Sequence, residues 1–239
     1  MKMTASPQHS GPGLSASEAA VARGASIYTP WTLALYDVVV LGLSNALVWR
    51  FSTRHILNLY NENVSGRHLD VGVGTGYFLD RCRFPIGAPT IALLDLNPNS
   101  LAATAKRLRR YAPSCHQGNV LDPVDFGMCR FDSIGLNYLL HCLPGNLRTK
   151  STVFHHLKLL LSDKGVLFGS TILGKDVQRS LPARSLMNLY NAKGVFSNLS
   201  DCKQDLEAGL DSHFDEYAVR VQGCVALFSA RKPKLDLRV

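Results

Sequence analysis

The stretch "HLDVGVGTGYF", from His68 to Phe78, decides the fold. A short apolar run contains one aspartate, three glycines follow at alternate positions, and an apolar segment with helical spacing comes next. This order predicts a strand that turns sharply into a helix, because glycine lets the backbone turn and approach a ligand closely. The stretch therefore predicts a ligand-binding loop at the end of a strand.

The residues around Gly72, Gly74 and Gly76 restrict the ligand. Bulky Tyr77 follows where a dinucleotide loop of the G-x-G-x-x-G type needs its last glycine, and no Lys-Ser/Thr pair follows to make a P-loop. Asp70, two residues before the first glycine, would repel a pyrophosphate. The same carboxylate suits a ligand that carries an ammonium and a sulfonium.

A second acidic residue, Asp95, ends the apolar segment "TIALLDLN", 19 residues after Gly76. A carboxylate at the end of the second strand accepts hydrogen bonds from both hydroxyls of a ribose, a feature that NAD sites share. A ligand with a ribose, a cationic end and no phosphate is S-adenosylmethionine.

Outward from this loop, strand patterns alternate with helix patterns. The predicted strands are "RHLDVGVG", "TIALLDLN", "SCHQGNV", "FDSIGLNYLL" and "GVLFGSTIL". Asn97 and Pro98 predict the N-cap and first turn of the helix after the second strand. Strands that are apolar on both faces indicate a parallel sheet covered on each side. By contrast, "EYAVRVQGCVALFSARK" alternates on each side of Gly223, which predicts an antiparallel hairpin.

The N-terminal part has a different character. Residues 1–25 are rich in Ser, Ala, Gly and Pro and lack the apolar stretch of a signal peptide, so we expect a disordered tail. Helical patterns over 30–49 and 53–62, the second capped by Thr53, predict a helical lid over 26–63 ahead of a core over 64–239. The whole of 26–239 is expected to form one domain.

Composition restricts the partners and the compartment. The net charge is +8, and the densest basic run, 106–110, lies on a predicted helix, where a solvated face is expected. The six cysteines form no C-x-x-C pair, which predicts reduced thiols, no metal site and a cytoplasmic protein. The most apolar stretch, "LALYDVVVLGLSNALVW", is short for a membrane span and contains Asp37 and Asn45.

Several motifs together carry a family resemblance. "LDVGVGTG", "LLDLNP", "GNV" and "FDSIGLNYLLHCLP" resemble the class I S-adenosylmethionine-dependent methyltransferases over about residues 66–172. This resemblance implies an α/β fold with a Rossmann-like, seven-stranded sheet that is mostly parallel with an antiparallel C-terminal hairpin. The stretch "YTPWTLALYD" also resembles a small group of bacterial and fungal methyltransferases of secondary metabolism.

The resemblance implies a set of site residues. Asp70 and the glycine backbone would hold the methionine part, and Asp95 the ribose. Asn119 stands where an acidic residue is commoner; its amide oxygen still accepts from the adenine amino group, and a turn without a ligand is the alternative. The implied cofactor set is Tyr28, Asp70, Gly72, Gly74, Gly76, Asp95, Leu96, Asn119, Val120 and Asn137.

Aromatic residues and one histidine are the predicted contacts of the methyl acceptor. Trp31, Tyr36 and Tyr138 are expected to contact the substrate. Methyl transfer from a sulfonium is an in-line displacement, which needs a base only when a hydroxyl or a protonated amine is the nucleophile. His141, just past the fourth strand, is the expected base; packing over the cofactor is its alternative role.

These observations predict a methyltransferase for a small-molecule metabolite, with O-methylation favoured, acting as a monomer or homodimer. A rearrangement or cyclisation on the same fold, driven by the sulfonium charge, remains an alternative. A nucleic-acid partner is disfavoured, because "NYLLHCLPG" lacks the Asn/Asp-Pro-Pro-Tyr/Phe element that holds a flipped base.

Overall fold

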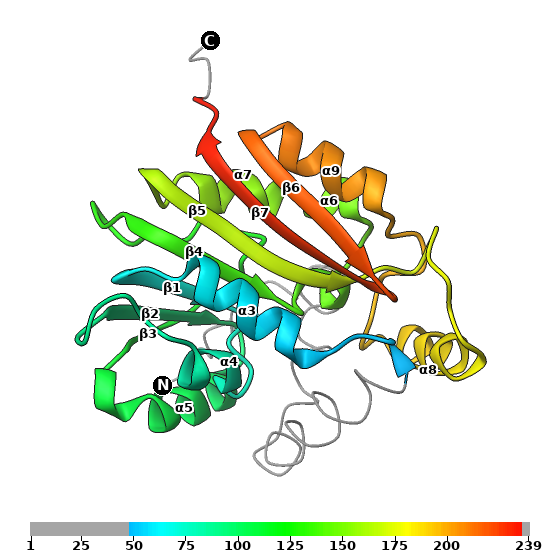
Figure 1. Ribbon diagram of the computed structural model, residues 1–239, viewed down its shortest axis with the longest axis horizontal. Helices are drawn as coiled ribbons and strands as arrows, with labels where there is room; N and C mark the ends of the chain where they lie inside the picture. Colours follow the sequence, from blue (N-terminus) through cyan, green and yellow to red (C-terminus); the bar gives the residue numbers. More distant parts are fainter. Residues whose placement is uncertain (1–47, 236–239) are drawn as a thin grey trace, which may run out of the picture.

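The computed structural model describes residues 48–235 of the chain (Figure 1). The predicted tail over 1–25 lies outside the described residues, together with Tyr28, Trp31 and Tyr36 of the predicted lid.

All described strands form one seven-stranded sheet, in the order β3-β2-β1-β4-β5-β7-β6. The strands are β1 Arg67–Val71, β2 Thr90–Asp95, β3 Ser114–Gln117, β4 Phe131–Asn137, β5 Leu161–Ile172, β6 Phe214–Gln222 and β7 Val225–Pro233. Neighbours from β3 to β5 are parallel, whereas β7 runs antiparallel to both β5 and β6. The predicted fold class, including its C-terminal hairpin, is confirmed.

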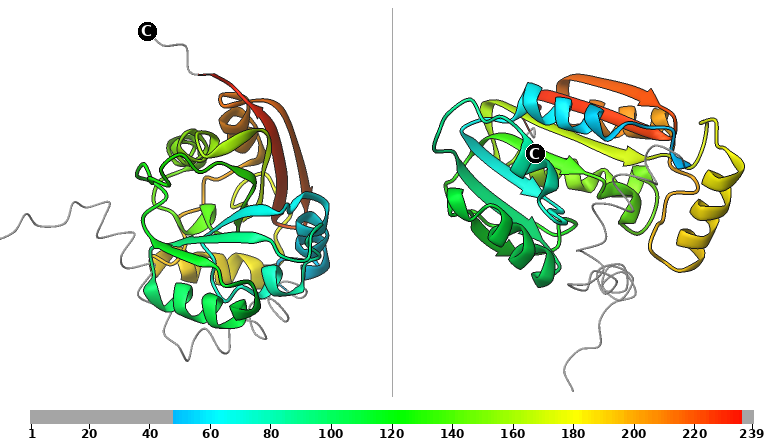
Figure 2. Two further views of the ribbon diagram at one scale, coloured as in Figure 1. Left: turned by 90° about the vertical axis from the view of Figure 1, so that its left-hand side faces the viewer. Right: turned by 60° about the horizontal axis from the view of Figure 1, so that its bottom comes forward.

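Helices cover both faces of this sheet (Figures 1 and 2). The α-helices are α3 Thr53–Asn63, α4 Tyr77–Arg81, α5 Pro98–Arg107, α6 Leu147–Lys150, α7 Thr152–Lys158, α8 Leu181–Ala192 and α9 Lys203–Asp211, and the short 3-10 helices are η2 Arg109–Tyr111 and η3 Leu140–Cys142. One core cluster joins α3, α4, α5 and α8 to one face, and the other joins α6, α7 and α9 to the opposite face. Helix α8 lies beyond the carboxyl ends of β4 and β5 (Figure 1).

Helix α3 belongs to the core layer. Its buried residues Ile56, Leu59 and Tyr60 pack on the sheet, so the described part of the predicted lid covers a sheet face. Its N-cap is Ser52, one residue before the predicted Thr53, because the Ser52 hydroxyl accepts a hydrogen bond from the Arg54 amide.

The predicted cap of α5 is present, whereas the predicted helix over 146–161 is divided. The Asn97 side chain caps α5 with Pro98 in the first turn, as predicted. The single helix expected from "NLRTKSTVFHHLKLLL" is instead split into α6 and α7 at Ser151. The end of that stretch enters the sheet, because Leu161 pairs with Phe131 before a register shift in β5.

The basic run 106–110 is only partly a solvated face. Arg110 forms an ion pair with Asp80 at 2.5 Å, and Arg107 donates to the Thr75 hydroxyl at 3.2 Å. The half-buried Arg107 thus contacts the glycine loop, while Lys106 and Arg109 are exposed.

Candidate active site

The glycine loop joins β1 to α4. Gly72, Gly74 and Gly76 all have left-handed backbones, with φ of 69°, 54° and 70°. A side chain at Gly72 would meet Leu139 at 2.9 Å, and one at Gly76 would meet Thr104 at 2.7 Å. These two glycines therefore allow the loop to pack closely against Leu139 and Thr104.

Gly74 differs from its two neighbours. A Cβ at this position would meet no atom of residues 48–235 within 4 Å, so this part of the structure leaves open space beside the middle of the loop. The Thr104 hydroxyl donates to the Gly74 carbonyl at 3.2 Å, which anchors the loop to α5. An anchored backbone beside open space suits a ligand that must approach the main chain closely.

Asp95, at the end of β2, lies beside this loop. Its carboxylate accepts a hydrogen bond from the Asn97 amide at 2.8 Å. Hydrogen bonds from the backbone amides of Val73 and Gly74 favour its charged form, but burial dominates and raises the pKa of Asp95 to about 6. Leu96 follows, and its carbonyl accepts from Gln117 at 3.1 Å. The predicted ribose acceptor and the loop are thus neighbours.

Asp70 is buried under helix α3. Its Oδ1 accepts a hydrogen bond from the Tyr60 hydroxyl at 2.7 Å and lies 3.5 Å from His68 Nε2. Room for this carboxylate depends on Gly135 of β4, where a Cβ would stand 2.6 Å from Oδ1. Tyr60 was missed from the sequence, where its only signal is a tyrosine on the apolar side of a helix.

Asn137 and Tyr138 follow at the carboxyl end of β4. Asn137 Oδ1 accepts from the Ser170 hydroxyl at 2.9 Å, whereas its buried Nδ2 interacts with the Tyr60 hydroxyl but makes no regular hydrogen bond within residues 48–235. A buried amide without a regular hydrogen bond is costly, and a ligand that accepts from it would remove that cost. Tyr138 has a φ of 54°, a strained conformation for a bulky residue that is commonest at functional sites.

His141 lies in η3 and is 3% exposed. Its Nδ1 accepts from the Ile172 amide at 3.4 Å and is 3.5 Å from the Thr171 hydroxyl. Burial, with a smaller contribution from the Lys150 charge, lowers the pKa of His141 to about 3. The ring is therefore neutral at physiological pH with its proton on Nε2, an arrangement that favours the packing alternative over the predicted base.

Aromatic rings gather beyond the carboxyl ends of β4 and β5. Phe196 contacts His141 edge to face at 4.5 Å and Tyr190 at 5.0 Å, and its ring lies 6.3 Å from that of Trp49. Tyr138 also contacts the His141 ring, with the two centroids 5.7 Å apart. No local spacing in the sequence links Trp49, Tyr190 and Phe196, so their grouping could not be predicted from it.

The predicted adenine contacts lie in a tight turn after β3. Asn119 Oδ1 accepts from the Leu121 amide at 3.1 Å, and its Nδ2 donates to Asp122 at 3.0 Å. Val120 is buried in the core. The contacts of Asn119 favour the turn alternative, although an amide oxygen keeps a second lone pair for a ligand.

The donor set therefore fits S-adenosylmethionine. Open backbone at Gly74, the acceptor at Asp95 and the buried amide of Asn137 lie at one edge of the sheet. Within residues 48–235 no three His, Cys, Asp or Glu side chains gather as a metal site, and no helix there is long and apolar enough to cross a membrane. All six cysteines are free thiols, as predicted.

Comparisons with known proteins identify the family of the chain. A family model described as a methyltransferase domain matches residues 69–167. The chain is 38% identical over 210 residues to demethylluteothin O-methyltransferase of Streptomyces thioluteus, covering 88% of this chain and 91% of that one. It is 37% identical over 215 residues to the physcion biosynthesis cluster O-methyltransferase of Aspergillus chevalieri, covering 89% and 96%.

Solved structures support the fold. The DhpI–SAH complex superposes with a TM-score of 0.63 and covers 89% of this chain and 96% of that chain. Its sequence identity is 14%, so this likeness concerns the fold alone.

Proposed function

The chain belongs to the S-adenosylmethionine-dependent methyltransferases, and from this premise we propose that it methylates an oxygen atom of a small secondary metabolite. The observation that carries the proposal is the 38% identity, over most of both chains, to an O-methyltransferase that acts on demethylluteothin. The physcion-cluster relative is also named an O-methyltransferase. Both names point to small natural products as acceptors.

The cofactor supplies an electrophilic methyl group on a sulfonium when it is bound. In our proposal Asp95 accepts from its ribose hydroxyls, and the backbone at Gly74 lies along its methionine part. Asp70, whose Oδ1 is held by Tyr60, faces the ammonium. The Asn137 Nδ2 donates to an oxygen of the ligand, which gives this buried amide a regular hydrogen bond.

The acceptor oxygen must form a bond to the methyl carbon as the sulfur–carbon bond breaks, and its proton leaves to solvent or to a base. The pKa of His141, lowered to about 3, makes this ring a weak proton acceptor. An acceptor with an acidic hydroxyl, such as a phenol or an enol, needs the least help with its proton. The rings of Tyr138 and Phe196 suit a planar molecule of this class.

Calorimetric titration with S-adenosylmethionine, S-adenosylhomocysteine and NAD tests the cofactor part. We expect micromolar binding of the first two and none of NAD. Absence of binding by all three would contradict it.

A screen of small phenols and enols with methyl-labelled cofactor tests the acceptor part. Product mass separates methyl transfer from the alternative rearrangement or cyclisation, in which the product carries no added methyl group.

The compartment, the oligomeric state and the role of residues 26–47 complete the proposal. We propose a cytoplasmic enzyme, which the six free thiols support, acting as a monomer or homodimer. We further propose that residues 26–47 complete the acceptor side, with Tyr28 at the cofactor and Trp31 and Tyr36 at the substrate.

A further inference from the structure

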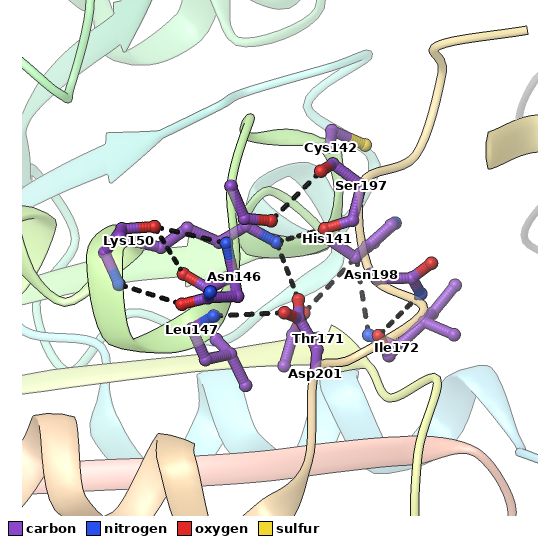
Figure 3. Close-up of polar contacts among 12 residues, drawn as sticks. His141, Cys142, Asn146, Leu147, Lys150, Thr171, Ile172, Ser197, Asn198 and Asp201 are labelled. Carbon is purple, nitrogen blue, oxygen red and sulfur yellow. Dashed lines mark hydrogen bonds and ion pairs between the residues drawn. The ribbon is translucent and has the colours of Figure 1, made fainter.

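A buried ion pair between Lys150 and Asp201 lies near His141 (Figure 3). Lys150 of α6 is 1% exposed and Asp201 is fully buried. The Lys150 ammonium lies 2.6 Å from Asp201 Oδ2 and also donates to the Ser197 carbonyl. The other carboxylate oxygen of Asp201 accepts from the Leu147 amide at 3.0 Å. Both charges therefore make directional contacts, the ammonium to two acceptors and the carboxylate to two donors.

The segment 196–201 is tied to the site at several points (Figure 3). The Ser197 amide donates to the His141 carbonyl at 2.8 Å. The Asn198 side chain donates to the Ile172 carbonyl at 2.9 Å, and Ile172 in turn donates to His141 Nδ1. The segment thus links the end of β5 to η3, and the ion pair anchors it from the side of α6.

Phe196 stands at the start of this segment, and its ring contacts His141 at 4.5 Å. Lys150 holds the carbonyl of the very next residue, Ser197. Any movement of Ser197 therefore moves Phe196 relative to His141 and Trp49.

A charged pair is a poor choice for stability alone. Burial lowers the pKa of Lys150 and raises the pKa of Asp201, while their mutual attraction opposes both shifts. Well-packed apolar residues commonly replace such a pair without loss of stability. What apolar residues could not supply are the directed contacts to Ser197 and Leu147.

We propose that Lys150 and Asp201 are positioning residues for the methyl acceptor: they hold segment 196–201 so that Phe196 forms one wall of the acceptor site against His141. The role in acceptor binding rests on the proposed function. The anchoring of the wall can be tested without any acceptor.

Fluorescence tests the anchoring first. In a Trp31→Phe background Trp49 is the sole tryptophan, and it is buried beside Phe196. We expect Lys150→Met to increase iodide quenching of Trp49. The matched control is Lys158→Met, which removes a buried lysine of α7 that donates to the Lys234 carbonyl at 2.9 Å. Quenching that is unchanged by Lys150→Met, or raised equally by Lys158→Met, would overturn the anchoring.

Kinetics test the effect on the acceptor. Lys150→Met is expected to raise the KM for the acceptor about tenfold, because small misplacements in a site are costly. The calorimetric Kd for the cofactor should stay at the wild-type value.

The double variant Lys150→Met/Asp201→Asn separates folding from positioning. It leaves no uncompensated buried charge, so we expect thermal stability to recover while the acceptor KM stays raised. A wild-type KM in the double variant would overturn the proposal.

The two proposals can fail independently. Absence of methyl transfer by the wild-type enzyme would contradict the proposed function and leave the fluorescence result in force. Active wild-type enzyme with unchanged quenching in Lys150→Met would contradict only the positioning role.

Discussion

Asp95 shows how burial sets the behaviour of a single side chain. Its carboxylate must be ionised to accept from two ribose hydroxyls, yet burial raises its pKa to about 6. Ligand hydroxyls favour the charged form, so binding and ionisation of Asp95 support each other.

Cofactor affinity should therefore depend on pH in a defined direction. As pH falls from about 7 to about 5, protonation of Asp95 should weaken S-adenosylhomocysteine binding about tenfold. Calorimetry across this range measures the effect. Asp95→Asn should bind more weakly with a flat profile; an equal slope in this variant would assign the titration to another group.

The Tyr60 hydroxyl holds Asp70, and its loss should be felt in two ways. Tyr60→Phe keeps the ring contacts to Phe78 and Phe168 but removes the donor to a buried carboxylate. We expect the free energy of unfolding to fall by about 1–3 kcal/mol and cofactor binding to weaken. Tyr217→Phe, an exposed tyrosine of β6, is the control and should change neither. Wild-type cofactor affinity in Tyr60→Phe would remove Asp70 from the binding role.

His141 acts either by packing or as a base, and the two roles predict a different dependence of turnover on the pKa of the acceptor hydroxyl. His141→Ala should lower turnover about tenfold through lost packing against Phe196, with cofactor affinity nearly unchanged. When acceptors whose hydroxyl groups differ in pKa are compared, the loss of turnover in His141→Ala should be the same for all of them. A loss that grows with the hydroxyl pKa would instead identify His141 as the base.

At the scale of elements, the glycine loop combines two demands. All three glycines need a left-handed backbone, but only Gly74 has open space where a side chain would stand. Gly127 offers a matched comparison, because it too has a positive φ and open space, in a turn before β4.

Alanine at these two positions should separate folding from binding. Gly74→Ala and Gly127→Ala should each cost about 1 kcal/mol of stability from backbone strain. Only Gly74→Ala is expected to weaken cofactor binding, by about tenfold or more, because its methyl group occupies ligand space. Equal cofactor affinities of Gly74→Ala and Gly127→Ala would show that the ligand does not bind beside Gly74.

Periodicity and capping residues predicted most elements of the fold. The strands around the loop, the Asn97 cap and the hairpin at Gly223 follow from local pattern. Predictions failed where tertiary pairing decided: Leu161 leaves a helical pattern because Phe131 pairs with it. Tyr60 and Phe196 were missed because their contacts depend on the folded chain: Tyr60 reaches Asp70 from another element, and Phe196 reaches His141, 55 residues earlier in the sequence.

At the scale of the whole molecule, both core clusters form within residues 48–235. The seven strands described above all lie in this region.

Truncation therefore tests the predicted division of the chain. Removal of residues 1–25 should leave kcat and KM unchanged, as expected of a tail. Removal of 1–47 should still leave a cooperative thermal transition, because the sheet and its helices remain. Turnover should then be lost with Tyr28, Trp31 and Tyr36. Full activity of the shorter chain would show that these residues are dispensable.

The strand order has a consequence for how such an enzyme could be re-engineered. Strands β1 to β3, with the glycine loop and Asp95, form one side of the sheet and come from one continuous stretch of chain, while β4 to β7, with the segments that carry His141 and Phe196, form the rest. The two stretches meet along the β1–β4 pairing, and one connection, 118–130, joins them. A single genetic crossover in that connection would therefore exchange the half that carries His141 and Phe196, Asn137 included, between relatives. The glycine loop, Asp95 and residues 26–47 would stay in place.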